Sequence, residues 1–129
     1  MRLPVRIVTI VLLLLGLAAL LCRVAWVGDD ALITLRTVYH WSLGYGPVWN
    51  VAERVQTYTH PLWMLLLALA HVLSGEFFYG TIVLSLVTAL LAALVLMLSA
   101  RTALAAIAVA ALLVGSNGFV NFATSGLEN

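Results

Sequence analysis

Charge is scarce in this chain: charged residues make up 9% of its 129 residues, and the formal net charge is +1. An ordinary soluble domain carries about 25% charged and about 45–50% apolar residues, whereas 64% of this chain is hydrophobic. The composition therefore indicates an integral membrane protein, and it lacks the basic footprint of a nucleic-acid-binding protein. The lone cysteine, Cys22, excludes an internal disulfide. The sequence also lacks a phosphate-binding glycine loop, a dinucleotide fingerprint, a zinc pattern and a Ser-His-Asp order.

The first hydrophobic run covers residues 7–27 and is interrupted only by Arg23. About 20 apolar residues suffice to span a bilayer, so this run predicts a transmembrane helix. Its basic start also fits a signal peptide, but without an A-x-A cleavage pattern we favour an uncleaved anchor. Arg2 and Arg6 precede the run. By the positive-inside rule, they predict a cytoplasmic N-terminus and place residues 28–76 outside the membrane, in the periplasm or its equivalent.

Residues 81–100 and 102–120 are two further apolar runs of spanning length. The run 61–73 is shorter: as a helix it would cover about 20 Å of a hydrocarbon core about 30 Å thick. We therefore expect it to lie flat at the outer interface. A crossing helix at 61–73 stays open as an alternative, and it would make four spans and put Arg101 outside.

The sequence thus predicts an all-α, polytopic membrane protein with three transmembrane helices and two interfacial helices in the first outer loop. Residues 121–129 would emerge outside. There, Ser125 and Glu128 have the spacing of a capping box that opens another helix. We therefore expect the chain to be an N-terminal fragment of a longer membrane domain.

The first interfacial helix is predicted over residues 29–43, which carry an apolar stripe at helical spacing. The stripe consists of Ala31, Leu32, Leu35, Val38, Tyr39 and Leu43. Asp29, Arg36 and His40 lie on the opposite side of the helix.

Asp29 and Asp30 are the candidate catalytic residues. Acids are favoured at a helix N-terminus, so the pair fits a solvated helix start. It equally fits a general base at a membrane edge, where a neighbouring acid raises one pKa. Arg36 and His40 form either a solvated polar stripe or a phosphate-binding pair. No cofactor is predicted with certainty, and a divalent metal held by Asp29, Asp30 and His40 stays an alternative without a matching motif.

A dense polar segment precedes the second interfacial helix. It contains Asn50, Glu53, Arg54, Gln56, Tyr58, Thr59 and His60. Hydroxyls, amides and aromatic rings recognise sugars, so the segment is either a sugar- or phosphate-contacting site or an ordinary loop. Glu128 is assigned either to the capping box or to the same outer site. Trp26, Trp41, Trp49 and Trp63 are expected to anchor at the membrane interface.

Three segments carry a family resemblance: DD-x-LI-x-LRTV, G-x-GPV-x-N-x-x-ERV and FATSGLE. Together they resemble the N-terminal part of glycosyltransferases of the GT-C fold that use polyprenyl-phosphate sugars. The most similar branch contains the mycobacterial terminal arabinofuranosyltransferases. The sequence departs from the usual family pattern at Ala52, in QTYTHPLW, and at Asn129.

The resemblance implies an outward-facing site that transfers a sugar, with inversion, from a polyprenyl-phosphate donor to a cell-envelope glycan or glycoprotein. Asp29 or Asp30 would be the base. The residues implied to hold the lipid phosphate are Arg36, Arg54, Tyr58 and His60. The rival hypothesis is a small non-enzymatic integral membrane protein or a subunit of an envelope assembly complex, in which both acids would tolerate alanine.

Overall fold

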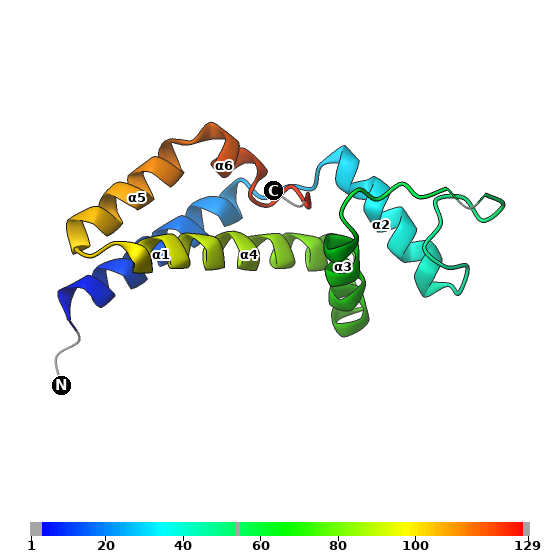
Figure 1. Cartoon of the computed structure of the whole chain (residues 1–129), viewed down its shortest axis with the longest axis horizontal. Helices are drawn as coiled ribbons and strands as arrows, with labels where there is room; N and C mark the ends of the chain where they lie inside the picture. Colours follow the sequence, from blue (N-terminus) through cyan, green and yellow to red (C-terminus); the bar gives the residue numbers. More distant parts are fainter. Residues whose placement is uncertain (1–3, 54, 128–129) are drawn as a thin grey trace. The chain divides into compact units, whose positions relative to one another are not determined.

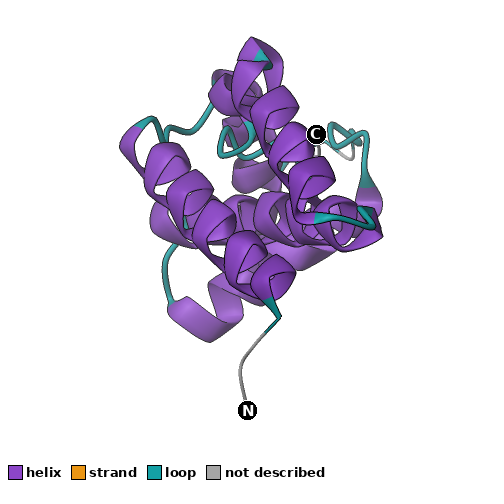
Figure 2. Cartoon of the chain, turned by 90° about the vertical axis from the view of Figure 1, so that its left-hand side faces the viewer, coloured by secondary structure: helices purple, strands orange, loops and turns teal. Residues whose placement is uncertain are grey.

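The computed structural model describes residues 4–53 and 55–127, and in these ranges it consists of helices and loops without a strand (Figures 1 and 2). The helices are α1 (Val5–Arg23), α2 (Asp29–Ser42), α3 (Pro61–Ser74), α4 (Phe78–Ser99), α5 (Ala103–Gly115) and α6 (Asn117–Phe122). The predicted all-α class is confirmed for this part of the chain. The chain divides into two compact units. Unit 1 contains Met1–Ala25 and Leu86–Thr124, and unit 2 contains Trp26–Ser85 and Ser125–Asn129.

Unit 1 packs α1, the C-terminal part of α4, and α5 side by side (Figure 1). Its core holds Leu21 of α1, Ala93 and Met97 of α4, and Ala106 of α5, each with 0% of its surface exposed. Small residues such as alanine let helix backbones approach closely. The helices of unit 1 are therefore held by close packing of small against large apolar side chains.

Arg6 ties the start of α1 to the end of α4. Its Nη2 donates a hydrogen bond to the backbone oxygen of Leu98, one of the last carbonyls of α4. Such carbonyls have no partner within their own helix, and a cation there also opposes the negative end of the helix dipole. The contact fixes α1 and α4 in antiparallel directions within unit 1.

Two helices, α1 and α4, are long and apolar enough to cross a membrane. α1 ends at Arg23, before the predicted limit at residue 27, and α4 begins at Phe78, before the predicted start at residue 81. Both helices are apolar on all sides, yet only 17% of the apolar window of α1 and 22% of that of α4 are buried. Helices of this kind need an apolar environment or further apolar protein around them.

The predicted third span over residues 102–120 is wrong. α5 ends at Gly115 after 13 residues, and α6 begins separately at Asn117. Between them Ser116 has extended backbone, and its hydroxyl accepts a hydrogen bond from Phe119 N at 3.2 Å, which caps α6 as a new helix. Serine, asparagine and glycine favour caps and turns over helix interiors. Hydropathy averaged over residues 102–120 does not reveal this break, because the residues on both sides of it are apolar.

Unit 2 is built on α2 and α3. Pro61 occupies the first turn of α3, where its missing N–H costs nothing, and Gly75 ends that helix in the left-handed conformation with φ of 72°. Leu35 and Val38 of α2 pack against buried residues of α3, namely Trp63, Met64 and Leu67. The bounds of α2 and α3 lie close to the predicted ranges 29–43 and 61–73. Their place at a membrane interface stays a prediction.

The buried stripe of α2 is narrower than the sequence predicts. Ala31, Leu35 and Val38 are buried, as expected of a core-facing stripe. Three other members of the predicted stripe are exposed: Leu32 (50%), Tyr39 (48%) and Leu43 (53%). The apolar arc of the helix therefore extends beyond the part that α3 covers.

Replacing Ala106 by leucine tests the packing of α5 on α1 in unit 1. Ala106 is fully buried, so the added carbons must push the helices apart, and we expect a loss of about 1–3 kcal/mol in the free energy of unfolding. A denaturation curve of the chain in detergent measures this loss. Ala108→Leu is the matched control on the exposed side of α5. Equal stability of the two variants would contradict the packing described here.

Candidate functional site

The two aspartates occupy the first turn of α2. Asp29 and Asp30 are exposed, and the preceding Gly28 is buried at the N-cap position. Gly28 donates its backbone N–H to the carbonyl oxygen of Ser125 at 2.7 Å. The positive end of the helix dipole favours carboxylates here. Neighbouring helical residues point about 100° apart, so the two acids face different directions.

A turn from the far end of the chain lies beside these aspartates. Gly126 has φ of 83°, and its carbonyl oxygen accepts a hydrogen bond from Trp63 Nε1 at 2.8 Å. A Cβ atom at position 126 would lie 2.7 Å from Thr81 Cγ2 and 2.9 Å from Ala31 Cβ. Only glycine fits here, both for conformation and for space. Two of the three sequence motifs, DDALI and FATSGLE, therefore meet at the start of α2.

The predicted capping box of Ser125 and Glu128 stays a prediction, because it extends beyond the described residues. Ser125 is buried, and Gly126 lies in the left-handed region. The described residues around them form turns. Glu128, the other half of the box and a candidate site residue, lies outside the described residues.

Trp63 is a residue whose role the sequence analysis missed. It was assigned to the membrane interface, but it is only 8% exposed and belongs to the core of unit 2. A buried tryptophan needs an acceptor for its indole N–H, and Gly126 supplies it. In the sequence, the feature that comes nearest to indicating this burial is its position on the inner side of a helix, two residues after Pro61.

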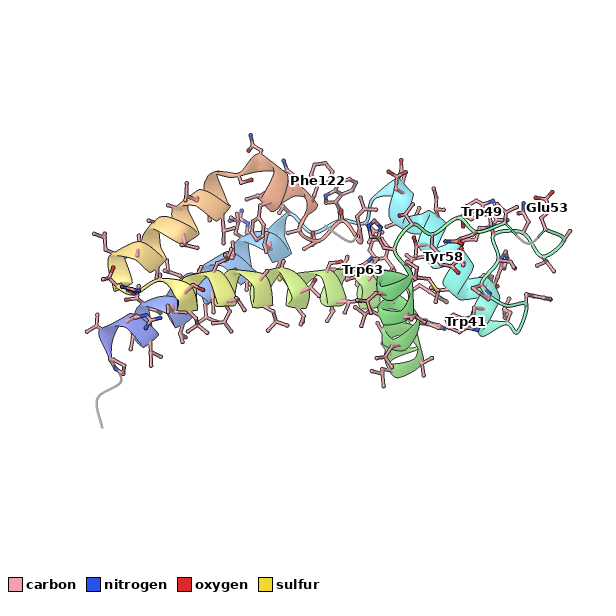
Figure 3. All side chains as sticks on the ribbon, viewed as in Figure 1. Trp41, Trp49, Glu53, Tyr58, Trp63 and Phe122 are labelled. Atoms are coloured by element: carbon pink, nitrogen blue, oxygen red, sulfur yellow. The ribbon has the colours of Figure 1, made fainter. Side chains whose placement is uncertain are left out.

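Arg36 holds the loop that follows α2. Its Nε donates to the backbone oxygen of Trp49 at 3.2 Å, and its Nη2 donates to Asn50 Oδ1 at 3.3 Å. The guanidinium carbon also lies 4.5 Å from the centroid of the Trp49 ring, within cation–π range. Figure 3 shows Trp49 on this loop. Arg36 thus has a structural role in holding the loop, and phosphate binding by Arg36 and His40 stays a prediction.

His40 and Thr37 hold the same loop at two more points. His40 Nδ1 lies 3.0 Å from the backbone oxygen of Val48; because a carbonyl only accepts, Nδ1 carries the proton. The hydroxyl groups of Thr37 and Thr57 are 3.1 Å apart and share a hydrogen bond. The side chains of α2 that face away from α3 therefore act as anchors for the loop.

The geometry of α2 separates the proposed metal ligands. His40 follows Asp29 by eleven positions along the helix, which is about 16 Å at 1.5 Å per residue. One ion cannot bind both side chains over that distance. Within residues 4–53 and 55–127, no three His, Cys, Asp or Glu side chains come together as a metal site.

The remaining predicted site residues lie along the loop between α2 and α3. Glu53 is exposed where the chain turns back, and its N–H donates to the carbonyl oxygen of Asn50 at 3.2 Å (Figure 3). Tyr58 is partly buried against the α2–α3 core. Thr59 Oγ1 and His60 Nδ1 are 2.9 Å apart and exposed just before α3. Arg54 lies outside the described residues.

Comparison with known proteins identifies relatives that share one name. Over 116 residues the chain is 35% identical to a terminal beta-(1->2)-arabinofuranosyltransferase of Mycobacterium tuberculosis, and this alignment covers 81% of the chain and 18% of the relative. Over 38 residues it is 53% identical to the Corynebacterium glutamicum protein of that name, covering 30% of the chain and 6% of the relative. The chain is thus homologous to a part of these transferases, as its motifs predict, and spans less than two thirds of their length. No family model and no solved structure matches the chain.

Replacing Gly126 by alanine tests the turn beside the aspartates. The left-handed conformation costs a side chain about 1–2 kcal/mol, and the contacts with Thr81 and Ala31 add to this cost. We expect the turn to detach, so that the indole N–H of Trp63 exchanges with solvent faster, as followed by NMR. Gly75→Ala is the control, because Gly75 has the same left-handed backbone with nothing within 4 Å. Unchanged Trp63 exchange in Gly126→Ala would refute the proposed constraint.

Replacing Arg36 by lysine tests the anchoring of the loop. A lysine cannot donate simultaneously to Trp49 and Asn50 in the geometry of a guanidinium. We expect the amide protons of Val48 and Glu53 to exchange about 3- to 10-fold faster, as for a lost hydrogen bond of ordinary strength. Arg101→Lys, at an exposed position between α4 and α5, should leave these rates unchanged. Equal rates in all three proteins would mean that Arg36 does not hold the loop.

Proposed function

We propose that this chain is part of a membrane glycosyltransferase. The whole protein would transfer a sugar, with arabinofuranose as the first choice, from a polyprenyl-phosphate donor to a cell-envelope glycan or glycoprotein. The observation that carries this proposal is the 35% identity, over 81% of the chain, to a protein named as a terminal beta-(1->2)-arabinofuranosyltransferase. The meeting of the DDALI and FATSGLE motifs in unit 2 supports a functional role for that place.

In the proposed reaction the carboxylate of Asp29 or Asp30 takes the proton from an acceptor hydroxyl. The hydroxyl oxygen then forms a bond to the anomeric carbon of the donor sugar. The bond from that carbon to the phosphate oxygen breaks, and its electron pair leaves with the polyprenyl phosphate. Attack from the side opposite the phosphate inverts the anomeric centre. Because the two acids point in different directions, only one of them serves as the base.

The exposure of both aspartates supports this role, because a base must reach a substrate hydroxyl. The position in the first turn of α2 supports it as well, since the helix dipole favours acidic side chains there. Of the residues proposed to hold the lipid phosphate, Arg36 is engaged with the loop and Tyr58 packs on the core. His60, exposed at the start of α3, is the better candidate for that role among the described residues, and Arg54 stays a candidate from the sequence alone.

We further propose that α1 and α4 cross the membrane with the N-terminus in the cytoplasm. Their antiparallel directions support a chain that does not cross between them, and this leaves residues 28–76 outside. The length of α3 agrees: its 14 residues reach about 21 Å, less than a bilayer core of about 30 Å. This arrangement brings Arg101 to the cytoplasmic side together with Arg6.

Replacing each aspartate by asparagine tests the proposed base. In a transferase-deficient host that expresses the longest form of the gene, we expect one of Asp29→Asn and Asp30→Asn to lower sugar transfer about 10²- to 10⁴-fold. The other variant should have a mild effect, because its side chain faces away from the acceptor. Envelope glycan analysis at matched membrane expression measures the transfer.

Glu76→Gln is the control for loss of a negative charge, because Glu76 is exposed between α3 and α4. Its transfer should equal that of the parent protein. If both aspartate variants also transfer sugar normally, the two acids are surface charges at a helix start. The non-enzymatic membrane protein would then be the better account.

A further inference from the structure

The loop between α2 and α3, residues 43–60, is long, and its described residues, 43–53 and 55–60, form no regular secondary structure. Loops longer than about 12–15 residues are uncommon in compact domains and are usually functional or disordered. This loop is held to α2 at the three points described above, by Arg36, Thr37 and His40. A long loop with that many anchors is preorganised, which lowers the entropic cost of binding a ligand.

The anchored loop forms an open hollow of about 340 Å³. Tyr45, Gly46, Pro47, Val48, Val55 and Gln56 line it. Two left-handed glycines, Gly44 and Gly46, turn the chain into one wall, with φ of 86° and 83°. The bond from His40 Nδ1–H to the oxygen of Val48 holds the same wall. Small-molecule sites are hollows of this kind, with aromatic and apolar walls and a few polar groups.

The chemistry of the lining identifies the class of ligand. The polar groups of the backbone and of Gln56 disfavour a lipid chain as the ligand. Tyr45 is 56% exposed, and its ring offers an apolar face beside hydrogen-bonding groups. Sugars combine apolar C–H faces with hydroxyl groups that both donate and accept. The described lining therefore suits a carbohydrate.

We propose that this hollow binds the acceptor glycan several sugar units away from the reacting hydroxyl. The inference rests on the proposed function, since it assumes a glycan acceptor. Val48 of the hollow is bonded to His40, which follows Asp29 by eleven positions along α2, a distance of about 16 Å along the helix axis. One sugar cannot reach both places, but an extended oligosaccharide can. The hollow would thus select long acceptors over short ones.

Titration of the chain with a linear arabinofuranosyl oligosaccharide tests the proposal directly. We expect saturable shifts of the backbone NMR signals of Gly46, Val48 and Gln56, with the chain held in a detergent micelle. Tyr45→Ala should weaken binding about 3- to 10-fold, as for the loss of one aromatic contact. Tyr45→Phe keeps the ring and should bind nearly as the parent does.

Tyr79→Ala is the matched control, because Tyr79 is an exposed tyrosine of α4 outside the hollow. It should bind the oligosaccharide with unchanged affinity. The absence of saturable shifts, or equal affinities for Tyr45→Ala and the parent chain, would overturn the proposed subsite.

Comparing a long acceptor with a short one distinguishes a failure of the proposed subsite from a failure of the proposed transferase function. In the longest form of the protein, Tyr45→Ala should raise KM for the oligosaccharide and leave KM for the methyl glycoside of one arabinofuranose unchanged. An equal effect on both acceptors would overturn the subsite while transfer itself persists. If no acceptor is glycosylated but the oligosaccharide still binds at the hollow, the transferase proposal fails and the glycan site stands.

Discussion

The turn at residues 125–127 can form only where residue 126 has no side chain, and the arrangement of unit 2 depends on this constraint. Gly126 lies against Ala31 and Thr81, its carbonyl oxygen accepts the indole proton of Trp63, and the neighbouring Ser125 oxygen accepts from Gly28. One small turn therefore joins the start of α2, the first turn of α3 and the beginning of α4. Asp29 and Asp30 are held next to this junction, since they directly follow Gly28. The position of the two acids is thus set by packing and by two hydrogen bonds of ordinary length.

α2 has different tasks at its two ends. Its first turn carries the two exposed carboxylates. In its later turns, the side chains of Arg36 and His40 form hydrogen bonds with the loop. Moving the Arg36 guanidinium away from the loop would be costly, because its stacking on Trp49 and its two hydrogen bonds would be lost together. In the proposed transferase, the polar groups of α2 therefore shape the acceptor side of the site, while the phosphate side is left to residues near the start of α3.

The helices of unit 1 show that a lack of charged residues is not enough to identify a transmembrane helix. α1 and α4 have the length to cross a bilayer, whereas α5 stops after 13 residues although its composition is equally apolar. The hydroxyl of Ser116 satisfies a backbone donor of α6, so the break costs little even in apolar surroundings. Homology to named arabinofuranosyltransferases extends over 81% of the chain and therefore includes parts of both units.

The sequence by itself determined the helical class, the starts of α2 and α3, and the buried positions 31, 35 and 38. Acids or a proline in the first helical turn, and helical periodicity, act over a few residues. The sequence also carries the family resemblance. The residue types around Ser116 indicate the break between α5 and α6, although averaged hydropathy does not show it. Only the tertiary structure decided that Trp63 is buried, that Arg36 and His40 hold a loop, and that Gly126 lies beside the aspartates. These outcomes join groups far apart in the chain. No local propensity specifies such contacts, since they depend on which surfaces the folded helices bring together.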